Sequence, residues 1–246
     1  MASKVVLITG AARRIGADIA RAFHARDLDV LIHYRDSAGD ARALADELNH
    51  KRAGSAELLR AELTDPDQVR RLADEALACR GRLDVLVNNA SSFYPTPFGQ
   101  AGDDDWEQLL GSNLRAPFVL TQALAPALAQ TRGAIINLVD VYAEKPLWQH
   151  SLYCMAKAGL ASLTRSSARE LGPAVRVNGV APGPILWPEQ EQGMDAEAIT
   201  DATALKRSGE PGDIAGAVVW LAVDAPFVTG QILAVDGGRS LPLAGG

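Results

Sequence analysis

The stretch KVVLITGAARRIGADIA, residues 4–20, decides how this chain folds. Its first part, Val5 to Ile8, is a continuous apolar run of the kind found in strands buried on both faces of a parallel sheet. Gly10 then opens a turn, and apolar residues recur beyond it at helical spacing. A strand that runs through a glycine turn into a helix points free backbone N–H groups at one place. The stretch therefore predicts a phosphate site.

Strand and helix patterns alternate along the rest of the chain. Further strands are predicted at 29–34, 56–63, 83–87, 134–139, 175–180 and 231–235, and helices at 38–51, 66–79, from about 106, from 117, at 151–171 and at 214–221. Residues 91–105 are expected to form a loop, and residues 184–206 a substrate flap. This alternation favours parallel pairing with helices on both faces. We predict an α/β fold, a single-domain Rossmann-type doubly wound sheet of about seven strands over residues 1–246. Its ligand should lie between the first and fourth strands.

Composition excludes several classes of protein. The 246 residues are 48% hydrophobic, enough for one large core, yet no charge-poor apolar run is long enough to cross a bilayer. A net charge of −6 argues against a nucleic-acid partner. Cys79 and Cys154 indicate neither a disulfide framework nor a metal site. A strand that begins by Lys4 leaves no room for a signal peptide, so we expect a cytoplasmic protein without a metal.

The end of the second predicted strand bears on the choice of dinucleotide. An acidic residue there would bind the ribose 2′-hydroxyl of NAD, but the strand ends at Tyr34 and Arg35 follows. Arg35, Ser37 and Arg14 could together hold a 2′-phosphate. Against this, Asp36 places negative charge nearby, and Arg35 could be a solvated loop arginine. We favour NADP(H).

Tyr153 and Lys157 form a Y-x-x-x-K pair in the predicted helix 151–171. A separation of four residues puts both side chains on one face of a helix. A phenol is a poor acid or base at neutral pH, but a neighbouring ammonium favours phenolate and lowers its pKa. The pair is therefore a candidate acid–base centre, although such pairs also arise by chance on exposed helices.

These motifs together resemble the short-chain dehydrogenase/reductase family. TGAARRIG at 9–16 resembles its TGxxxGxG turn, with Arg14 in place of the middle glycine, and NNAS at 88–91 resembles its NNAG motif. The resemblance implies a hydride-transferring enzyme in which Asn113 completes a catalytic tetrad and tethers a water chain. Asn113 could otherwise be a helix-interior residue that bonds the backbone. Glu62 and Leu63 correspond to the family's adenine-side pair of Asp followed by Val or Leu, with Glu62 as a departure.

The cofactor contacts expected from these motifs are Gly10, Arg14, Ile15, Gly16, Arg35, Ser37, Glu62, Leu63, Asn89, Ala90, Ser91, Tyr153, Lys157, Pro182, Gly183 and Ile185.

Asp140 stands thirteen residues before Tyr153, where this family usually has a serine that donates to a substrate carbonyl. An ionised carboxylate only accepts hydrogen bonds, so it disfavours a ketone unless it stays protonated in a dry site. An amino-pyrimidinone ring offers N–H donors instead. Asp140 beside Tyr153 could position such a ring and help to relay a proton. The alternative is that Asp140 only caps a turn.

A closer resemblance is to the pteridine reductases, carried by NNASSFYPTP at 88–97, Asp140 and VDGGRSL at 235–241. It implies that Phe93 stacks on the pterin, that Arg14 reaches phosphate and pterin, and that Ser91 bonds the same region. The substrate residues are then Arg14, Ser91, Phe93, Asp140 and Tyr153. Phe93 could instead be a hydrophobic plug and Arg14 a solvent arginine. The acidic stretch 187–198 tilts the prediction toward a small pterin over a folate.

Three functions follow from these residues. The first is an NADPH-dependent reductase of oxidised pterins or dihydropterins, and possibly of folates, with Asp140, Tyr153, Lys157 and Asn113 as its catalytic set. The second is a general NADP-dependent ketone or alcohol dehydrogenase that tolerates a protonated Asp140. The third is a non-catalytic NADP(H)-sensing regulator, against which the intact acid–base set speaks. The resemblance also implies a homotetramer with long helices and the C-terminal strand at its interfaces.

Overall fold

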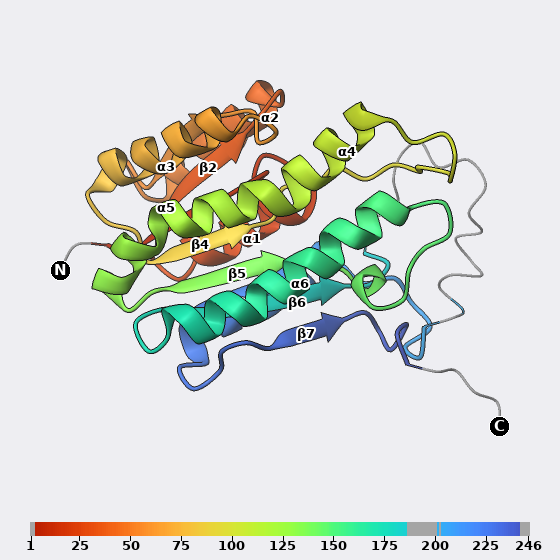
Figure 1. Ribbon diagram of the computed structural model, residues 1–246. Coiled ribbons are helices and arrows are strands. Elements are labelled where there is room, and N and C mark those ends of the chain that lie inside the picture. The colour runs from red at the N-terminus through yellow and green to blue at the C-terminus, as the bar shows by residue number, and fades with distance from the viewer. Residues whose placement is uncertain (1–2, 186–200, 202, 242–246) are drawn as a thin grey trace.

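A computed structural model describes residues 3–185, 201 and 203–241. They form a seven-stranded, wholly parallel sheet in the order β3-β2-β1-β4-β5-β6-β7 (Figure 1). The strands are β1 (Val5–Ile8), β2 (Asp29–Tyr34), β3 (Ala56–Arg60), β4 (Val85–Asn88), β5 (Ala134–Leu138), β6 (Arg176–Pro182) and β7 (Ile232–Val235). The predicted doubly wound sheet is confirmed. Most of the predicted flap, at 184–206, lies outside the described residues.

Helices cover both faces of the sheet. They are α1 (Arg14–His24), α2 (Ala38–Lys51), α3 (Pro66–Arg80), α4 (Asp103–Leu110), α5 (Ala116–Thr131), α6 (Ser151–Leu171) and α8 (Pro211–Val219). Short turns accompany them: η1 (Gly111–Arg115), η2 (Val141–Ala143) and η3 (Trp220–Asp224). Figure 1 shows α5 and α6 running across the near face of the sheet with α1 behind it.

Alternate residues of β1 divide the core into two layers. Val6 and Ile8 pack in one buried cluster with α1, α2 and α8, whereas Val5 and Leu7 pack in the other with α3 and α5. Successive side chains of a strand point to opposite faces, so a run that is apolar at every position supplies both layers. All four residues are at most 1% exposed. The first apolar run therefore anchors the whole sheet.

Several predicted boundaries were wrong, among them the start of the helix predicted at 214–221, since α8 begins at Pro211. The loop expected to reach residue 105 ends earlier, because α4 begins at Asp103 and Asp105 accepts a hydrogen bond from Gly102 N–H at 3.0 Å. Three consecutive carboxylates suit the first turn of a helix, where the dipole favours negative charge. The third strand was expected to reach Leu63 but ends at Arg60, and residues 61–63 turn toward the cleft described below.

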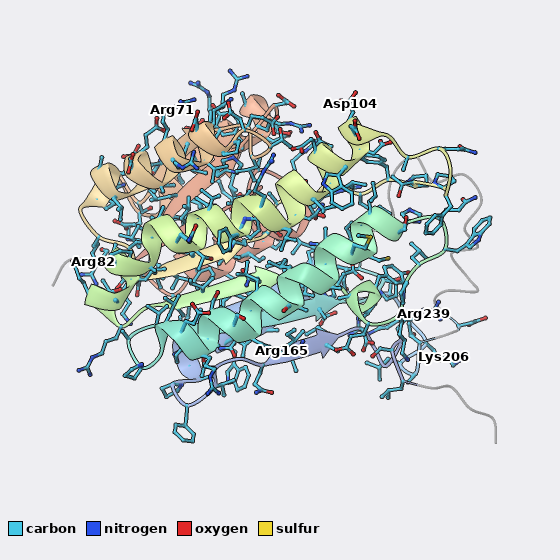
Figure 2. All side chains as sticks on the ribbon, in the orientation of Figure 1. Arg71, Arg82, Asp104, Arg165, Lys206 and Arg239 are labelled. Carbon is cyan, nitrogen blue, oxygen red and sulfur yellow. The ribbon has the colours of Figure 1, made fainter. Side chains whose placement is uncertain are left out.

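The carboxyl ends of the strands all lie at one edge of the sheet (Figure 1). Strands β2 and β3 lie on one side of β1, and β4 lies on the other side. The direction of the strand order therefore reverses between β1 and β4. Ligands of such sheets bind at this point. Arg239, labelled in Figure 2, lies at the same end of the molecule. No helix within the described part of the chain is long and apolar enough to span a membrane.

Candidate active site

A cleft of about 550 Å³ opens at the carboxyl edge of the sheet. All but one of the residues predicted from sequence line it: Gly10, Arg14, Ile15, Gly16, Arg35, Ser37, Glu62, Leu63, Asn89, Ala90, Ser91, Phe93, Asp140, Tyr153, Lys157, Pro182, Gly183 and Ile185. These residues come from the ends of six different strands and from the start of α6. The exception is Asn113, which is 1% exposed and lies behind the wall of the cleft.

The glycine turn after β1 is packed too tightly for any side chain at its two ends. A Cβ on Gly10, whose φ is +62°, would stand 2.9 Å from Ala90 Cα, and one on Gly16 would stand 2.3 Å from the Gly10 oxygen. The amide of Asn89 holds the turn by donating to the carbonyl oxygens of Thr9 (2.9 Å) and Gly10 (3.0 Å). The helix start thus stays open to a phosphate, and these residues fit a dinucleotide.

Arg14 stands where the family's turn has its middle glycine, and it adopts the left-handed backbone conformation that glycine favours. Its φ is +54°, in the left-handed region that costs a non-glycine residue roughly 1–2 kcal/mol. Arg14 is the first residue of α1, and it lines the cleft. The turn therefore combines a left-handed backbone at residue 14 with a cationic residue beside the phosphate site.

At the far end of the cleft, Arg35 is held between two carboxylates. Its guanidinium lies 2.6 Å from Asp36 and 3.7 Å from Glu62. Ser37 stands at the N-cap of α2 without capping it through its side chain. Glu62 Oε1 accepts from the backbone N–H of Thr64 at 2.9 Å. Arg35 is thus preoriented at the end of β2, where a ribose 2′ substituent would lie.

Asp140 and Tyr153 meet at the centre of the cleft. The Tyr153 hydroxyl donates to Asp140 Oδ2 at 2.7 Å, while Asp140 Oδ1 accepts from Tyr142 N–H at 2.9 Å. Asp140 is therefore also the N-cap of η2, so the turn-capping role and the cleft-facing role coexist in one carboxylate. Burial raises the pKa of Asp140, although Tyr142, Tyr153 and Lys157 each oppose this.

The state of Tyr153 differs from the sequence expectation. Burial first, and the adjacent Asp140 second, raise its pKa well above the usual 10, whereas a hydrogen bond with Ser91 lowers it only partly. The expected shift toward phenolate was wrong, because desolvation and the neighbouring Asp140 carboxylate both raise the pKa of Tyr153. Tyr153 is held as a protonated phenol, which is the state that a proton donor requires.

Lys157 lies beside the ring of Tyr153. Its Nζ donates to the Leu138 oxygen at 2.8 Å and lies 5.6 Å from the centroid of the Tyr153 ring. Lys157 is 2% exposed, and this burial lowers its pKa to about 8 while Asp140 partly opposes the shift. The cation stays close enough to stabilise negative charge on the phenol oxygen as the proton leaves.

Asn113 acts on the site through Ser91. Ser91 Oγ donates to Asn113 Oδ1 at 2.7 Å, and Asn113 Nδ2 donates to the oxygens of Ser92 and Leu109, both at 2.9 Å. The bond to Leu109 is the helix-interior backbone contact that we kept as the alternative. Asn113 is therefore hydrogen-bonded both to Ser91 in the cleft wall and to the backbone around it.

Phe93 belongs both to the cleft wall and to a small aromatic cluster. Its ring stacks on His150 with centroids 4.7 Å apart and an interplanar angle of 17°, and it meets Tyr153 edge-on at 4.7 Å. A parallel bridge between Thr96 and His150 ties the loop of Phe93 to the start of α6. Phe93 thus anchors its loop, as expected of a hydrophobic plug. It also lines the cleft.

Sequence reasoning missed several lining residues, among them His33, Leu138, Tyr142 and Arg239. Leu138 contributes a backbone oxygen, which no residue type reveals. His33 did carry a signal, because a histidine inside an otherwise apolar strand needs a polar partner. Arg239 lies in VDGGRSL, a motif noted only for its resemblance.

A glycine turn at the switch point of a parallel sheet, beside a buried tyrosine–lysine pair, defines a dinucleotide-binding oxidoreductase. A family model described as enoyl-(acyl carrier protein) reductase matches residues 10–240. The chain belongs to that family, one of the short-chain dehydrogenases/reductases, which use NAD(P)H. The non-catalytic regulator is therefore set aside.

Named relatives fall into two substrate classes. The chain is similar to pteridine reductase 1 of Leishmania tarentolae, at 36% identity over 98% of this chain and 97% of that protein. It is similar to nearly the same degree to two 3-oxoacyl-(acyl-carrier-protein) reductases. Identity is 35% to that of Synechocystis sp., over 97% of both chains, and 34% to that of Staphylococcus aureus, over 96% of this chain and 98% of the other.

A side chain at Gly16 should weaken cofactor binding. In Gly16→Ala the new methyl group would meet the Gly10 oxygen and the Asn89 amide, which stands 2.7 Å from the ideal Cβ, so the turn must open. We expect NADPH affinity, measured by fluorescence titration, to fall at least about tenfold. Gly39→Ala is the control, because nothing lies within 4 Å of a Cβ there. Equal NADPH affinity in the two variants would contradict a phosphate site at this glycine turn.

Lys157→Met should give an inactive but more stable protein at neutral pH. A lysine whose pKa falls from 10.5 to about 8 on folding costs stability in full below pH 8, and the cost disappears above pH 10.5. The variant should therefore gain up to about 3 kcal/mol at pH 7 in urea unfolding. That gain should shrink as the pH rises from 8 toward 10.5. If Lys157→Met were less stable than the wild type by the same amount at pH 8 and at pH 10.5, this would contradict the burial of a charged Lys157.

Proposed function

We propose that this protein is an NADPH-dependent reductase of pterins, which reduces oxidised pterins or dihydropterins to tetrahydropterins. The observation that carries the proposal is the Asp140 carboxylate in the cleft, bonded at 2.7 Å to the hydroxyl of Tyr153. A serine in this place would offer an O–H donor to a carbonyl oxygen, whereas an ionised carboxylate offers only lone pairs. The site is thus suited to a substrate that presents N–H groups.

Phe93 supports a flat heterocycle as the substrate. Its ring is fixed on one side by His150 and lines the cleft beside Asp140 and Tyr153. Aromatic pairs prefer offset or edge-on contact, so a planar ring in this space gains packing energy as well as hydrogen bonds. An open-chain substrate would leave that contact unused.

The chain's own residues supply and replace one proton. A nicotinamide dinucleotide held by the glycine turn and the cleft would supply hydride to the carbon of a ring C=N bond. Tyr153 then gives its hydroxyl proton to the nitrogen, so that C=N becomes CH–NH. Lys157 stabilises the phenolate that remains. Asp140 accepts hydrogen bonds from the N–H groups of the ring. Asp140 also helps to pass a proton from solvent back to Tyr153.

A second candidate function is the reduction of 3-oxoacyl thioesters. It is favoured by relatives of nearly equal identity and by the raised pKa of Asp140, since a protonated carboxyl could donate to a ketone. We rank it second because Asp140 already accepts two hydrogen bonds, from Tyr142 and Tyr153, and both favour the ionised form.

Preference for NADPH is part of the proposal. Arg35 stands at the end of β2 with no carboxylate in the strand end itself, and Arg14 and Ser37 line the same cleft. We also propose a cytoplasmic homotetramer. Two free cysteines suit a reducing compartment, and Trp106 and Phe118, each 45% exposed, border an apolar groove over α4, η1 and α5 that suits burial against another copy.

Substrate class is tested by an NADPH-oxidation screen over biopterin, dihydrobiopterin, monapterin, folate and an acetoacetyl thioester. We expect the highest kcat/KM with dihydrobiopterin. Turnover of the thioester with none of any pteridine would select the second function. A clear preference for folate over dihydrobiopterin would keep the reaction but reverse the expected substrate size.

Asp140→Ala should lower kcat for dihydrobiopterin about 100-fold, because the ring loses its acceptor and Tyr153 its proton partner. NADPH affinity should stay within twofold of the wild type. Asp104→Ala, on the exposed first turn of α4, is the control. Unchanged turnover in Asp140→Ala would remove the basis of the pterin proposal.

Arg35→Ala should weaken NADPH binding about tenfold and leave NADH binding within twofold, because a 2′-phosphate loses a charge-assisted bond. Fluorescence titration of both cofactors gives the comparison, with Arg42→Ala on the exposed face of α2 as the control. Parallel losses for NADPH and NADH would show that Arg35 does not read the 2′ position.

A further inference from the structure

His33 is a buried ionisable residue that the reaction does not use. It lies on β2, is 2% exposed, and touches the floor of the cleft. Each of its polar ends has a partner: Gly10 N–H donates to Nδ1 at 3.0 Å, and Nε2 lies 3.2 Å from the Ala61 oxygen. Its backbone oxygen accepts from Ala11 N–H at 2.9 Å.

These contacts fix the form of the ring. Nδ1 accepts from Gly10, so the hydrogen of the neutral imidazole stands on Nε2 and is donated to Ala61. Burial lowers the pKa of His33 to about 4, which keeps the ring neutral in the physiological range although Ala61 and Glu62 oppose the shift. A protonated ring would set an N–H against the N–H of Gly10.

The partners of His33 belong to two separate parts of the cofactor cleft. Gly10 opens the glycine turn, where its left-handed backbone is wedged against Ala90 on the other side. Ala61 directly precedes Glu62 and Leu63, which line the cleft beyond the end of β3. The ring therefore couples two segments that no strand pairing joins directly, because β3 and β1 are separated by β2.

The same contacts decide which amides remain for a phosphate. His33 takes the N–H of Gly10 through its ring and that of Ala11 through its backbone oxygen. The turn then has to present the amides at the start of α1, whose helix dipole favours an anion. A turn released from His33 would lose this orientation.

We propose that His33 is a positioning residue for the dinucleotide, which holds the glycine turn in its phosphate-binding orientation by accepting the N–H of Gly10. It acts through Gly10 and takes no part in proton transfer. The inference rests on the cofactor class of the family and is independent of which substrate is reduced.

Two near-isosteric variants separate the two ends of the ring. His33→Asn places an amide oxygen near the position of Nδ1 and keeps the bond from Gly10, whereas His33→Gln carries its amide near the position of Nε2 and keeps only the bond to Ala61. We expect NADPH and NADH affinities, measured by fluorescence titration, to fall about tenfold in His33→Gln and less than threefold in His33→Asn. With any substrate that is turned over, KM for the cofactor should rise while kcat at saturation stays within twofold.

His24→Gln is the matched control. His24 is also buried, at 7% exposure, but its Nε2 bonds Ser55 Oγ at 2.8 Å, away from the cleft. Its thermal stability can change, yet its cofactor affinity should not. Equal affinity losses in His33→Gln and His24→Gln, or in His33→Gln and His33→Asn, would overturn the proposal.

A measurement on the wild-type protein covers the case in which His33→Gln does not fold. A long-range ¹⁵N–¹H NMR spectrum of histidine-labelled protein should show His33 as the neutral Nε2–H tautomer, unchanged from pH 8 to pH 5. An Nδ1–H tautomer, or a charged ring in that range, would overturn the proposal, because neither can accept from Gly10.

Discussion

The hydrogen bond between the Tyr153 hydroxyl and the Asp140 carboxylate is the constraint around which the cleft is built. A charged group out of water needs hydrogen-bond partners, and Asp140 obtains one from the backbone of η2 and one from the tyrosine. Lys157 supplies positive charge from behind while it is itself tied to β5 through Leu138. Asp140 thus raises the pKa of Tyr153 and of Lys157, while both of these groups lower the pKa of Asp140 against the effect of its burial. The arrangement keeps Tyr153 protonated and leaves the Asp140 carboxylate lining the cleft.

The fold brings these groups together from distant parts of the chain. In a parallel sheet every strand delivers its carboxyl end to one edge, so β1 places the glycine turn and β5 places Asp140 on the same side. Helix α6 runs back against the strands, and therefore its first turn carries Tyr153 to that edge (Figure 1). The two core layers on either face hold this geometry rigid, as a site that must align hydride and proton transfer requires.

Much of this could be predicted from the sequence, for physical reasons. The apolar run at Val5 to Ile8 could only be a strand covered on both faces, and the spacing of Gly10 from Gly16 reflected contacts that exclude a Cβ at both positions. Asp140 was noticed because an ionised carboxylate cannot donate the hydrogen bond that the family's usual serine donates. Such features are local, or are set by a fixed helical or strand period, so one chain suffices to reveal them.

What could not be predicted depends on contacts between distant residues. The stacking of Phe93 on His150 joins two loops, and the hydrogen bond from Gly10 to His33 crosses between two strands. The pKa of Tyr153 depends on how deeply it is buried beside Asp140, which spacing alone does not give. The left-handed backbone of Arg14 was likewise hidden, because arginine has no preference for that conformation.

The most direct measurement is a crystal structure of the enzyme with NADP⁺ and dihydrobiopterin bound. A ring N–H or amino group should lie within about 3.2 Å of the Asp140 carboxylate, with the ring facing Phe93 and the nitrogen to be protonated facing Tyr153. A pterin bound elsewhere, or an Asp140 that contacts only Tyr142 and Tyr153 while the ring lies beyond its reach, would contradict a site organised around this carboxylate.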